Sequence, residues 1–64
     1  MKYTVISGDF RAAVDAIAPR QAAEEAFNLW RLKANKPSLA KITTVVKPNN
    51  EEIFLCTQSV LSAT

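Results

Sequence analysis

Residues 2–15 read KYTVISGDFRAAVD, and they predict the first unit of the fold, a β-hairpin. Gly8 and Asp9 separate two runs of alternating residues, and a glycine at the first position of a two-residue loop suits the type II′ turn of a β-hairpin. On one face the turn pairs Ser7 with Phe10, Val5 with Ala12, and Tyr3 with Val14. On the other face it pairs Ile6 with Arg11, Thr4 with Ala13, and Lys2 with Asp15. An apolar face with an opposite-charge pair on its reverse is typical of a half-buried hairpin, so we expect strands at 2–7 and 10–17.

Pro19 marks the start of a predicted helix, because a proline at the first helical position gives up no hydrogen bond. From Pro19 to Ala34 the apolar residues recur with a period of about 3.6 and form one face. These residues are Ala23, Ala26, Phe27, Trp30 and Ala34. The Lys36-Pro37 step ends the helix, since the residue before a proline avoids helical geometry.

The last third of the chain predicts a second hairpin. Residues 39–47 and 53–60 are rich in Ile, Thr and Val, and Pro48-Asn49-Asn50-Glu51 forms the turn between them. A two- or four-residue loop pairs Lys47 with Glu52, Val46 with Ile53, and Val45 with Phe54. The prediction is therefore one α+β domain over residues 1–64, with a four-stranded, largely antiparallel sheet in β-β-α-β-β order and one helix on one face. An alternative merges residues 10–18 into the helix, but the Lys2–Asp15 register and Pro19 argue against it.

One helix covers only one side of such a sheet. If Lys47 and Glu52 mark the outer side, the covered residues are Tyr3, Val5, Phe10, Val14, Ile42, Val46, Ile53 and Leu55. The uncovered apolar residues are then Ile6, Ile17, Leu39, Val45, Phe54, Cys56 and Val60. Contiguous exposed apolar surface is typical of interaction sites. We therefore predict a protein interface at Ile6, Leu39, Val45, Phe54 and Val60; the competing interpretation is a wrong register, with a loop or the C-terminal tail covering these residues.

A second candidate surface lies on the helix, where Leu29 and Leu32 point away from the Trp30 face. Two exposed leucines are also ordinary for a protein surface, because apolar atoms make up much of it.

The small size of the chain also favours a partner. A chain of 64 residues buries only about 60% of its unfolded surface. Its single cysteine, Cys56, forms no internal disulfide, and without histidine a zinc site is excluded. We expect no metal and no cofactor, which leaves a protein partner or a homo-oligomer, most simply a dimer, as the source of added stability.

The residues that catalysis needs are scarce. With no histidine there is no Ser-His-Asp or Cys-His arrangement, and with Gly8 as the single glycine there is no phosphate-binding glycine loop. Glu24-Glu25 and Glu51-Glu52 are adjacent in sequence, so the members of each pair point in different directions. Cys56 has no basic neighbour and behaves as a small hydrophobe. We expect a protein that is not an enzyme.

A basic stretch supports the alternative of a small domain that binds RNA or another nucleic acid. The net charge is +2, and residues 26–50 hold no acid. Their basic residues are Arg31, Lys33, Lys36, Lys41 and Lys47. Tyr3 and Phe54 would offer stacking surfaces on the sheet, although the paired aromatic ribonucleoprotein motifs are missing.

The sequence has no apolar run near the ~20 residues of a transmembrane helix. Gly8-Asp9 interrupts the N-terminal strand before a signal-peptide core could form. We therefore expect a cytoplasmic protein with no membrane partner.

The junction VDAIAPRQAAEEA at residues 14–26 resembles one found in small uncharacterised β-β-α-β-β proteins of bacteria and their phages. Those proteins typically begin with a Tyr-Thr-Val strand and a Gly-Asp turn, here residues 3–5 and 8–9. The resemblance covers the first half of the chain and carries over no functional residue. It implies a phage-type accessory protein that acts on a host partner. The chain departs from the pattern at Ala18, where a capping residue is usual, and at Val45 and Phe54 on the predicted outer face.

Overall fold

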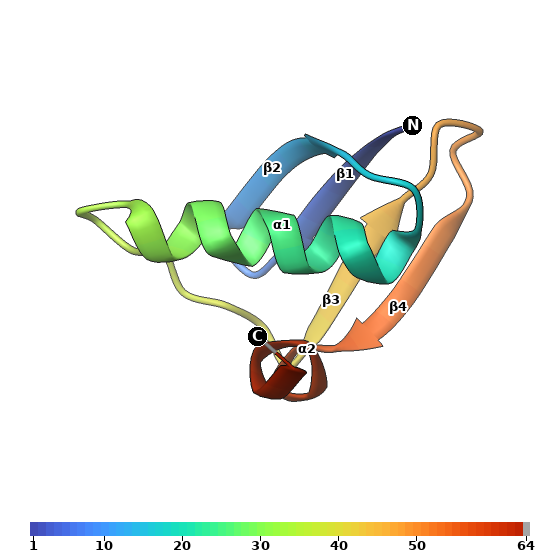
Figure 1. Cartoon of the computed structure of the whole chain (residues 1–64). Coiled ribbons are helices and arrows are strands. Elements are labelled where there is room, and N and C mark those ends of the chain that lie inside the picture. Colours follow the sequence, from blue (N-terminus) through green and yellow to red (C-terminus); the bar gives the residue numbers. More distant parts are fainter. Residues whose placement is uncertain (64) are drawn as a thin grey trace.

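A computed structural model describes residues 1–63 and confirms the predicted α+β fold. The elements are β1 (Lys2–Ser7), β2 (Phe10–Asp15), α1 (Pro19–Leu32), β3 (Ile42–Val46), β4 (Glu52–Cys56) and α2 (Thr57–Ala63). The four strands form one antiparallel sheet in the order β2-β1-β3-β4, and α1 crosses one face of it (Figure 1).

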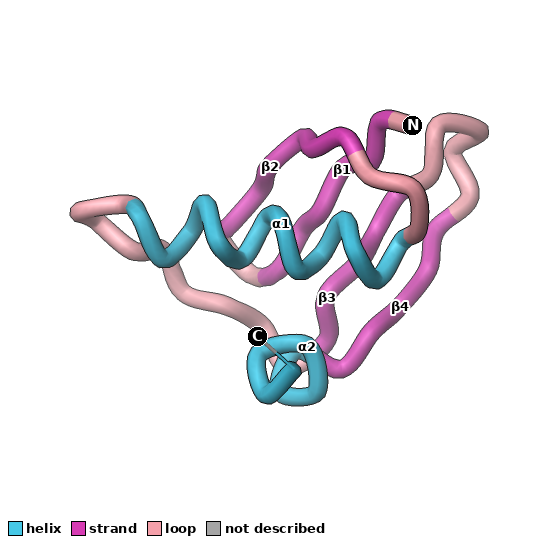
Figure 2. The backbone as a smooth tube through the Cα atoms, viewed as in Figure 1, coloured by secondary structure: helices cyan, strands magenta, loops and turns pink. Residues whose placement is uncertain are grey.

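The first hairpin has the predicted register at all six positions, from Lys2–Asp15 to Ser7–Phe10. Gly8 has a φ of +59° whereas Asp9 does not have a positive φ, as a type II′ turn requires. The loop 33–41, which joins α1 to β3, passes beside the turn (Figure 2). The amide of Asp9 donates to the Ser38 carbonyl at 3.0 Å, and a Cβ on Gly8 would lie 2.5 Å from that oxygen. Both the turn geometry and the close approach therefore require glycine here. The second strand ends at Asp15, two residues earlier than expected.

The second hairpin has a register one residue away from the prediction. Val46 pairs with Glu52, Val45 with Ile53, and Thr44 with Phe54. The reason is the connection, which spans the five residues between β3 and β4 instead of two or four. Asn50 has a φ of 70°, its amide donates to the Lys47 carbonyl at 2.9 Å, and the Lys47 amide donates to the Glu51 carbonyl at 2.8 Å.

This shift exchanges the faces of β3, because successive side chains of a strand point to opposite sides. Val45 is fully buried under α1, whereas Ile42 and Val46, which were expected to be covered, lie on the outer face. The strand β4 keeps the predicted faces, with Ile53 and Leu55 packed against the core and Phe54 on the outer side.

The core lies between α1 and the sheet. Its helical side consists of Ala22, Ala23, Ala26 and Phe27, all fully buried, and its strand side includes Tyr3, Val5, Phe10, Val14 and Val45. The small alanines let the helix approach the sheet, and the rings of Phe10 and Phe27 meet at 6.3 Å between centroids. Trp30 is only partly buried and donates its Nε1–H to the Pro37 carbonyl at 2.9 Å. Ala34 lies beyond the end of the helix and is exposed.

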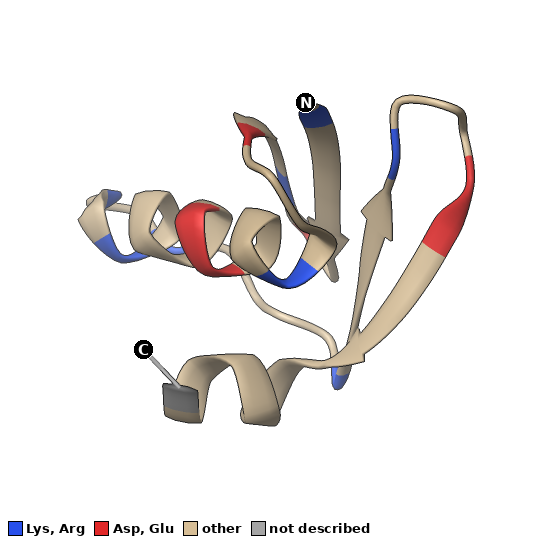
Figure 3. Cartoon of the chain, turned by 45° about the vertical axis from the view of Figure 1, so that its right-hand side comes forward, with Lys and Arg blue, Asp and Glu red and all other residues tan. Residues whose placement is uncertain are grey.

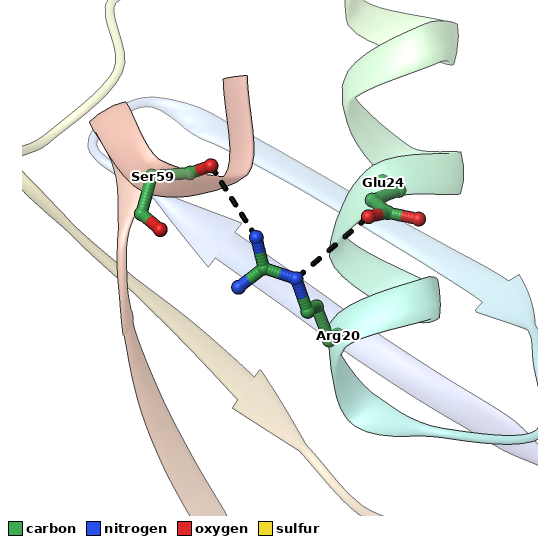
Figure 4. A network of polar contacts seen from close by, with 3 residues as sticks. All are labelled: Arg20, Glu24 and Ser59. Atoms are coloured by element: carbon green, nitrogen blue, oxygen red, sulfur yellow. Dashed lines mark hydrogen bonds and ion pairs between the residues drawn. The ribbon is translucent and has the colours of Figure 1, made fainter. Parts of the chain in front are cut away.

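The strand predicted over 53–60 is wrong after Cys56, because the chain turns there into α2. Val60 of α2 is fully buried and joins the core under α1. Figure 4 shows Arg20 of α1 between its own helix and α2: its Nη2 donates to the Ser59 carbonyl at 3.4 Å, and its Nε lies 3.8 Å from the Glu24 carboxylate.

Candidate functional site

The outer face of the sheet has no covering element within residues 1–63, because α1 and α2 lie on the same side of it (Figure 3). Apolar and threonine side chains occupy most of this surface. We call it the outer sheet face and define it by Thr4, Ile6, Ala13, Ile42, Thr44, Val46, Phe54 and Cys56. Phe54 is 64% exposed and Ile42 is 52% exposed, which is high for large apolar side chains.

Strand pairing places these residues in rows that cross the sheet. The first row runs Arg11, Ile6, Thr44, Phe54. The second row runs Ala13, Thr4, Val46, Glu52. A third, shorter row pairs Ile42 with Cys56. Directly opposed side chains on one face lie about 4.5–5.5 Å apart, so the apolar groups form one continuous band toward β4.

Charges lie at the borders of the outer sheet face. Arg11 is on β2, one edge strand, and Glu52 is on β4, the other edge strand. Lys2 and Asp15 face each other at one end of the first hairpin. The surface thus has an apolar centre bordered by charges of both signs, with Arg11 and Asp15 on the β2 edge and Glu52 on the β4 edge, and an apolar centre with a polar rim is the usual composition of a protein interface.

The predicted interface residues do not all reach this face. Ile6 and Phe54 lie on it as expected, and so does Cys56. The placement of Val45 and Val60 was wrong, since both are fully buried in the core because of the shifted register and the turn into α2. Leu39 was also misplaced: it lies in the loop before β3 and packs against the core.

Sequence reasoning missed Ile42 and Val46, which the outer sheet face contains. The signal that could have found them is Asn50, because asparagine tolerates a positive φ and so allows an odd loop length. Ile17, expected on the sheet, is 83% exposed but lies between β2 and α1.

The five basic residues of the nucleic-acid alternative are not brought together. Lys41 precedes β3 and Lys47 follows it, which separates them by about 20 Å along the strand. Lys47 Nζ lies 3.8 Å from the Glu51 carboxylate. The other three, Arg31, Lys33 and Lys36, gather at the C-terminal end of α1 (Figure 3).

Two of those three side chains contact aromatic rings of the same chain. Lys33 Nζ lies 5.7 Å from the centroid of the Phe10 ring, and Lys36 Nζ lies 5.3 Å from that of Trp30. Their ammonium groups therefore contribute to intramolecular packing at this end of the molecule.

The exposed leucines of α1 lie on the opposite side of the molecule from the outer sheet face. Leu29 is 47% exposed and Leu32 is 82% exposed. They make no continuous surface with the sheet, and Leu32 serves as a comparison residue of similar exposure to Phe54.

Three buried hydroxyl groups cluster at the junction of β1, β3 and α2. Thr57 donates to the Ala40 carbonyl at 2.6 Å, its Oγ1 lies 2.7 Å from that of Thr43, and Ser7 accepts from the Ala40 amide at 3.1 Å. A cleft of about 420 Å³ opens beside them. Its lining residues are Leu39, Ala40, Lys41, Cys56, Thr57 and Gln58. The hydroxyls satisfy one another and the backbone, so they tie the loop to the sheet and are not poised as nucleophiles.

Over the described part of the chain, no group of three His, Cys, Asp or Glu residues could hold a metal ion. No helix among residues 1–63 is both long enough and apolar enough to span a bilayer. Comparisons with protein-family models, with curated proteins and with solved structures found no match to this chain.

Proposed function

We propose that this chain is a small non-enzymatic module that binds protein through its outer sheet face. The observation that carries the proposal is the exposure of Phe54 and Ile42 on a face that also holds Ile6 and Val46. Large apolar groups that share one uncovered surface are typical of binding sites.

The arrangement also suits protein binding energetically. Burying one large apolar side chain contributes about 1.5–3 kcal/mol, and aromatic side chains near the centre of an interface are frequent hot spots. Phe54 has the largest such side chain on the outer sheet face, next to Thr44 and within the same row as Ile6. The methyl groups of the threonines extend the apolar area, whereas Arg11 and Glu52 border it.

The rest of the molecule supports a binding role without catalysis. The buried hydroxyls of Ser7, Thr43 and Thr57 are engaged with one another and with Ala40. The ion pairs Arg20–Glu24 and Lys47–Glu51 join neighbours within a helix or a turn. None of these groups is placed beside a base that would activate it.

A photo-crosslinking residue in place of Phe54 tests the proposal directly. A matched probe replaces Leu32, which is 82% exposed on the other side of the molecule. Each tagged variant is irradiated in the cells that express it, and covalent products are identified by mass spectrometry. We expect a discrete protein adduct from position 54 and none from position 32.

Other crosslinking products would point to a different function. Adducts to nucleic acid, or equal adducts from both positions, would contradict the proposal. A nucleic-acid product that disappears with added salt would instead support the basic alternative, because phosphate contacts release counterions. A host protein as the product would agree with what the resemblance of residues 14–26 implies.

A further inference from the structure

We propose that a second cleft, on the side of the sheet that α1 covers, binds a small organic acid whose carboxylate is held by Tyr3 and Lys47. The cleft measures about 330 Å³. Its lining residues are Met1, Tyr3, Pro19, Lys47, Pro48 and Asn49. We call it the Tyr3 cleft. It is separate from the outer sheet face, so the inference goes beyond the proposed function and does not depend on it.

The fold brings three segments together at the Tyr3 cleft. Strand β1 and helix α1 both begin there, and the connection from β3 to β4 contributes residues 47–49. Figure 1 shows the N-terminus, this connection and the start of α1 at one end of the molecule. Clefts of about 300–1,000 Å³ with apolar walls and a few convergent polar groups are the usual form of a site for a small ligand.

The hydroxyl of Tyr3 is the observation that carries the proposal. Tyr3 is 1% exposed and belongs to the core, yet within residues 1–63 its hydroxyl has no hydrogen-bond partner. Every side-chain oxygen or nitrogen of these residues that is sealed from solvent does have a partner. The small exposed part of Tyr3 is therefore its hydroxyl, which opens into the cleft. Buried tyrosine hydroxyls usually find a partner, and here a ligand would supply it.

The cleft beside Thr57 differs in this respect. The hydroxyls of Thr43 and Thr57 bond to each other, and Thr57 also donates to the Ala40 carbonyl. The polar groups at that cleft are satisfied within the chain, whereas the Tyr3 cleft keeps an unsatisfied hydroxyl. The Tyr3 cleft is therefore the better suited of the two to a polar ligand.

The polar side chains of the Tyr3 cleft can all donate hydrogen bonds. The Asn49 Oδ1 accepts from the Glu51 amide at 3.0 Å, which leaves the Asn49 amide nitrogen as a donor. Lys47 Nζ lies 3.8 Å from the Glu51 carboxylate, which is longer than a charge-assisted hydrogen bond and leaves the ammonium able to bind a ligand. No acidic side chain among residues 1–63 lines the cleft. Such a set of donors favours a ligand with negatively charged acceptor oxygens.

The start of α1 adds to the positive potential at the Tyr3 cleft. Ala18 makes no side-chain cap bond, and the first turn of the helix holds no acid. The free amides of a first helical turn carry the positive end of the helix dipole, and Pro19 places this end of α1 at the cleft wall. Met1, Pro19 and Pro48 make the rest of the wall apolar. The ligand class is therefore a carboxylate on an apolar body, in preference to a bare inorganic anion.

Benzoate is the probe that tests the proposal, and benzamide is its neutral counterpart. Amide chemical shifts of the labelled chain are followed by two-dimensional NMR up to about 10 mM of either compound. We expect saturable shifts at Tyr3, Lys47 and Asn49 with benzoate, with a dissociation constant on the order of 1 mM, and binding about tenfold weaker with benzamide. An absence of shifts at these positions, or equal affinity for the two compounds, would overturn the proposal.

Two variants identify the groups that hold the carboxylate. Tyr3→Phe keeps the ring in the core and removes the hydroxyl, and Lys47→Gln removes the charge at a position outside the core. Each is expected to weaken benzoate binding about fivefold or more. Lys41→Gln is the matched control, because Lys41 lies before β3, at the other end of that strand, and its affinity for benzoate should equal that of the wild type.

Urea unfolding followed by Trp30 fluorescence confirms that each variant is folded before binding is compared. Unchanged affinity in folded Tyr3→Phe, or in Lys47→Gln, would overturn the assignment of these groups. An equal loss in Lys41→Gln would show that net charge, and not the Tyr3 cleft, attracts the acid, and it would also overturn the proposal.

Discussion

The two faces of this sheet carry similar residues, but one face is buried beneath α1 and the other is not covered by any described element. On β3, Val45 is fully buried beneath α1, whereas its neighbour Val46 lies on the outer side. On β1, Val5 is fully buried and Ile6 is only half-buried. The difference is one position along the strand. A chain with one long helix can complete a core on one side of its sheet, and apolar residues on the other side are then available for a partner.

The two faces should respond differently to mutation. Loss of a side chain from the covered face removes packing on several sides and leaves a cavity, so the folding free energy falls. Loss of a side chain from the outer sheet face removes few contacts within the chain, so the folding free energy should change little. Pairs of matched substitutions, one on each face, therefore test whether the two faces differ in this way.

The largest effect is expected for Phe27→Ala, compared with Phe54→Ala. Phe27 is fully buried and packs against Phe10, so its truncation should cost about 3–5 kcal/mol and leave much of the chain unfolded. Phe54→Ala should change the free energy of unfolding of the single chain by no more than about 0.5 kcal/mol, because the Phe54 side chain is largely exposed. Urea unfolding followed by Trp30 fluorescence measures both. Equal losses at the two positions would show that the faces are not distinct.

The next largest effect concerns Val45→Ala and Val46→Ala, which test the register of the second hairpin. The buried Val45 should cost about 2 kcal/mol, because two methyl groups are lost and a cavity forms. Val46→Ala should cost less than about half of that. The same urea titration measures both losses. A larger loss for Val46→Ala than for Val45→Ala would support the register predicted from the sequence instead of the observed one.

A smaller effect is expected for Thr43→Val compared with Thr44→Val. The Thr43 hydroxyl lies 2.7 Å from that of Thr57 in the buried cluster, so its removal should cost about 1–2 kcal/mol. Thr44 is on the outer sheet face, where the same change is expected to leave the stability of the chain unchanged. Thermal unfolding measures both variants. A neutral Thr43→Val would mean that the cluster adds little to stability.

The smallest effect is expected for Arg20→Ala, compared with Arg31→Ala. Arg20 joins α1 to α2 through the Ser59 carbonyl, but its side chain is 49% exposed, so solvent and salt screen the contact. We expect a loss of at most about 0.5–1 kcal/mol, largest at low salt. Amide exchange in α2 should rise in Arg20→Ala and stay unchanged in Arg31→Ala. Identical exchange in both variants would exclude Arg20 as a tie between the helices.

The sequence was sufficient for the first hairpin and for the helix because their signals are local. Gly8-Asp9 specifies one turn type and hence one register, and Pro19 marks the start of α1. The fold class followed from these two elements together with the second hairpin, whose two strands and intervening turn were also predicted. On the outer sheet face, Ile6, Phe54 and Cys56 were placed correctly for the same reason, since their strands were assigned to the correct side.

The remaining errors come from tertiary contacts that no local pattern specifies. The five-residue connection at Asn50 shifted β3 by one position, which exchanged Val45 for Val46 and brought Ile42 outward. The short helix α2 forms where Thr57 bonds to the backbone of the loop before β3, a contact distant in sequence. The three β3 residues of the outer sheet face, Ile42, Thr44 and Val46, therefore required the structure.

Amide chemical shifts recorded by two-dimensional NMR, without and with the protein captured by the probe at position 54, test most directly whether the outer sheet face is the contact surface. We predict shifts centred on Ile6, Thr44 and Phe54, with the exposed helix positions Leu29 and Leu32 unchanged. Shifts centred on α1 and the loop 33–41, with β1 and β3 unchanged, would contradict the account. So would a probe at position 54 that forms no protein adduct.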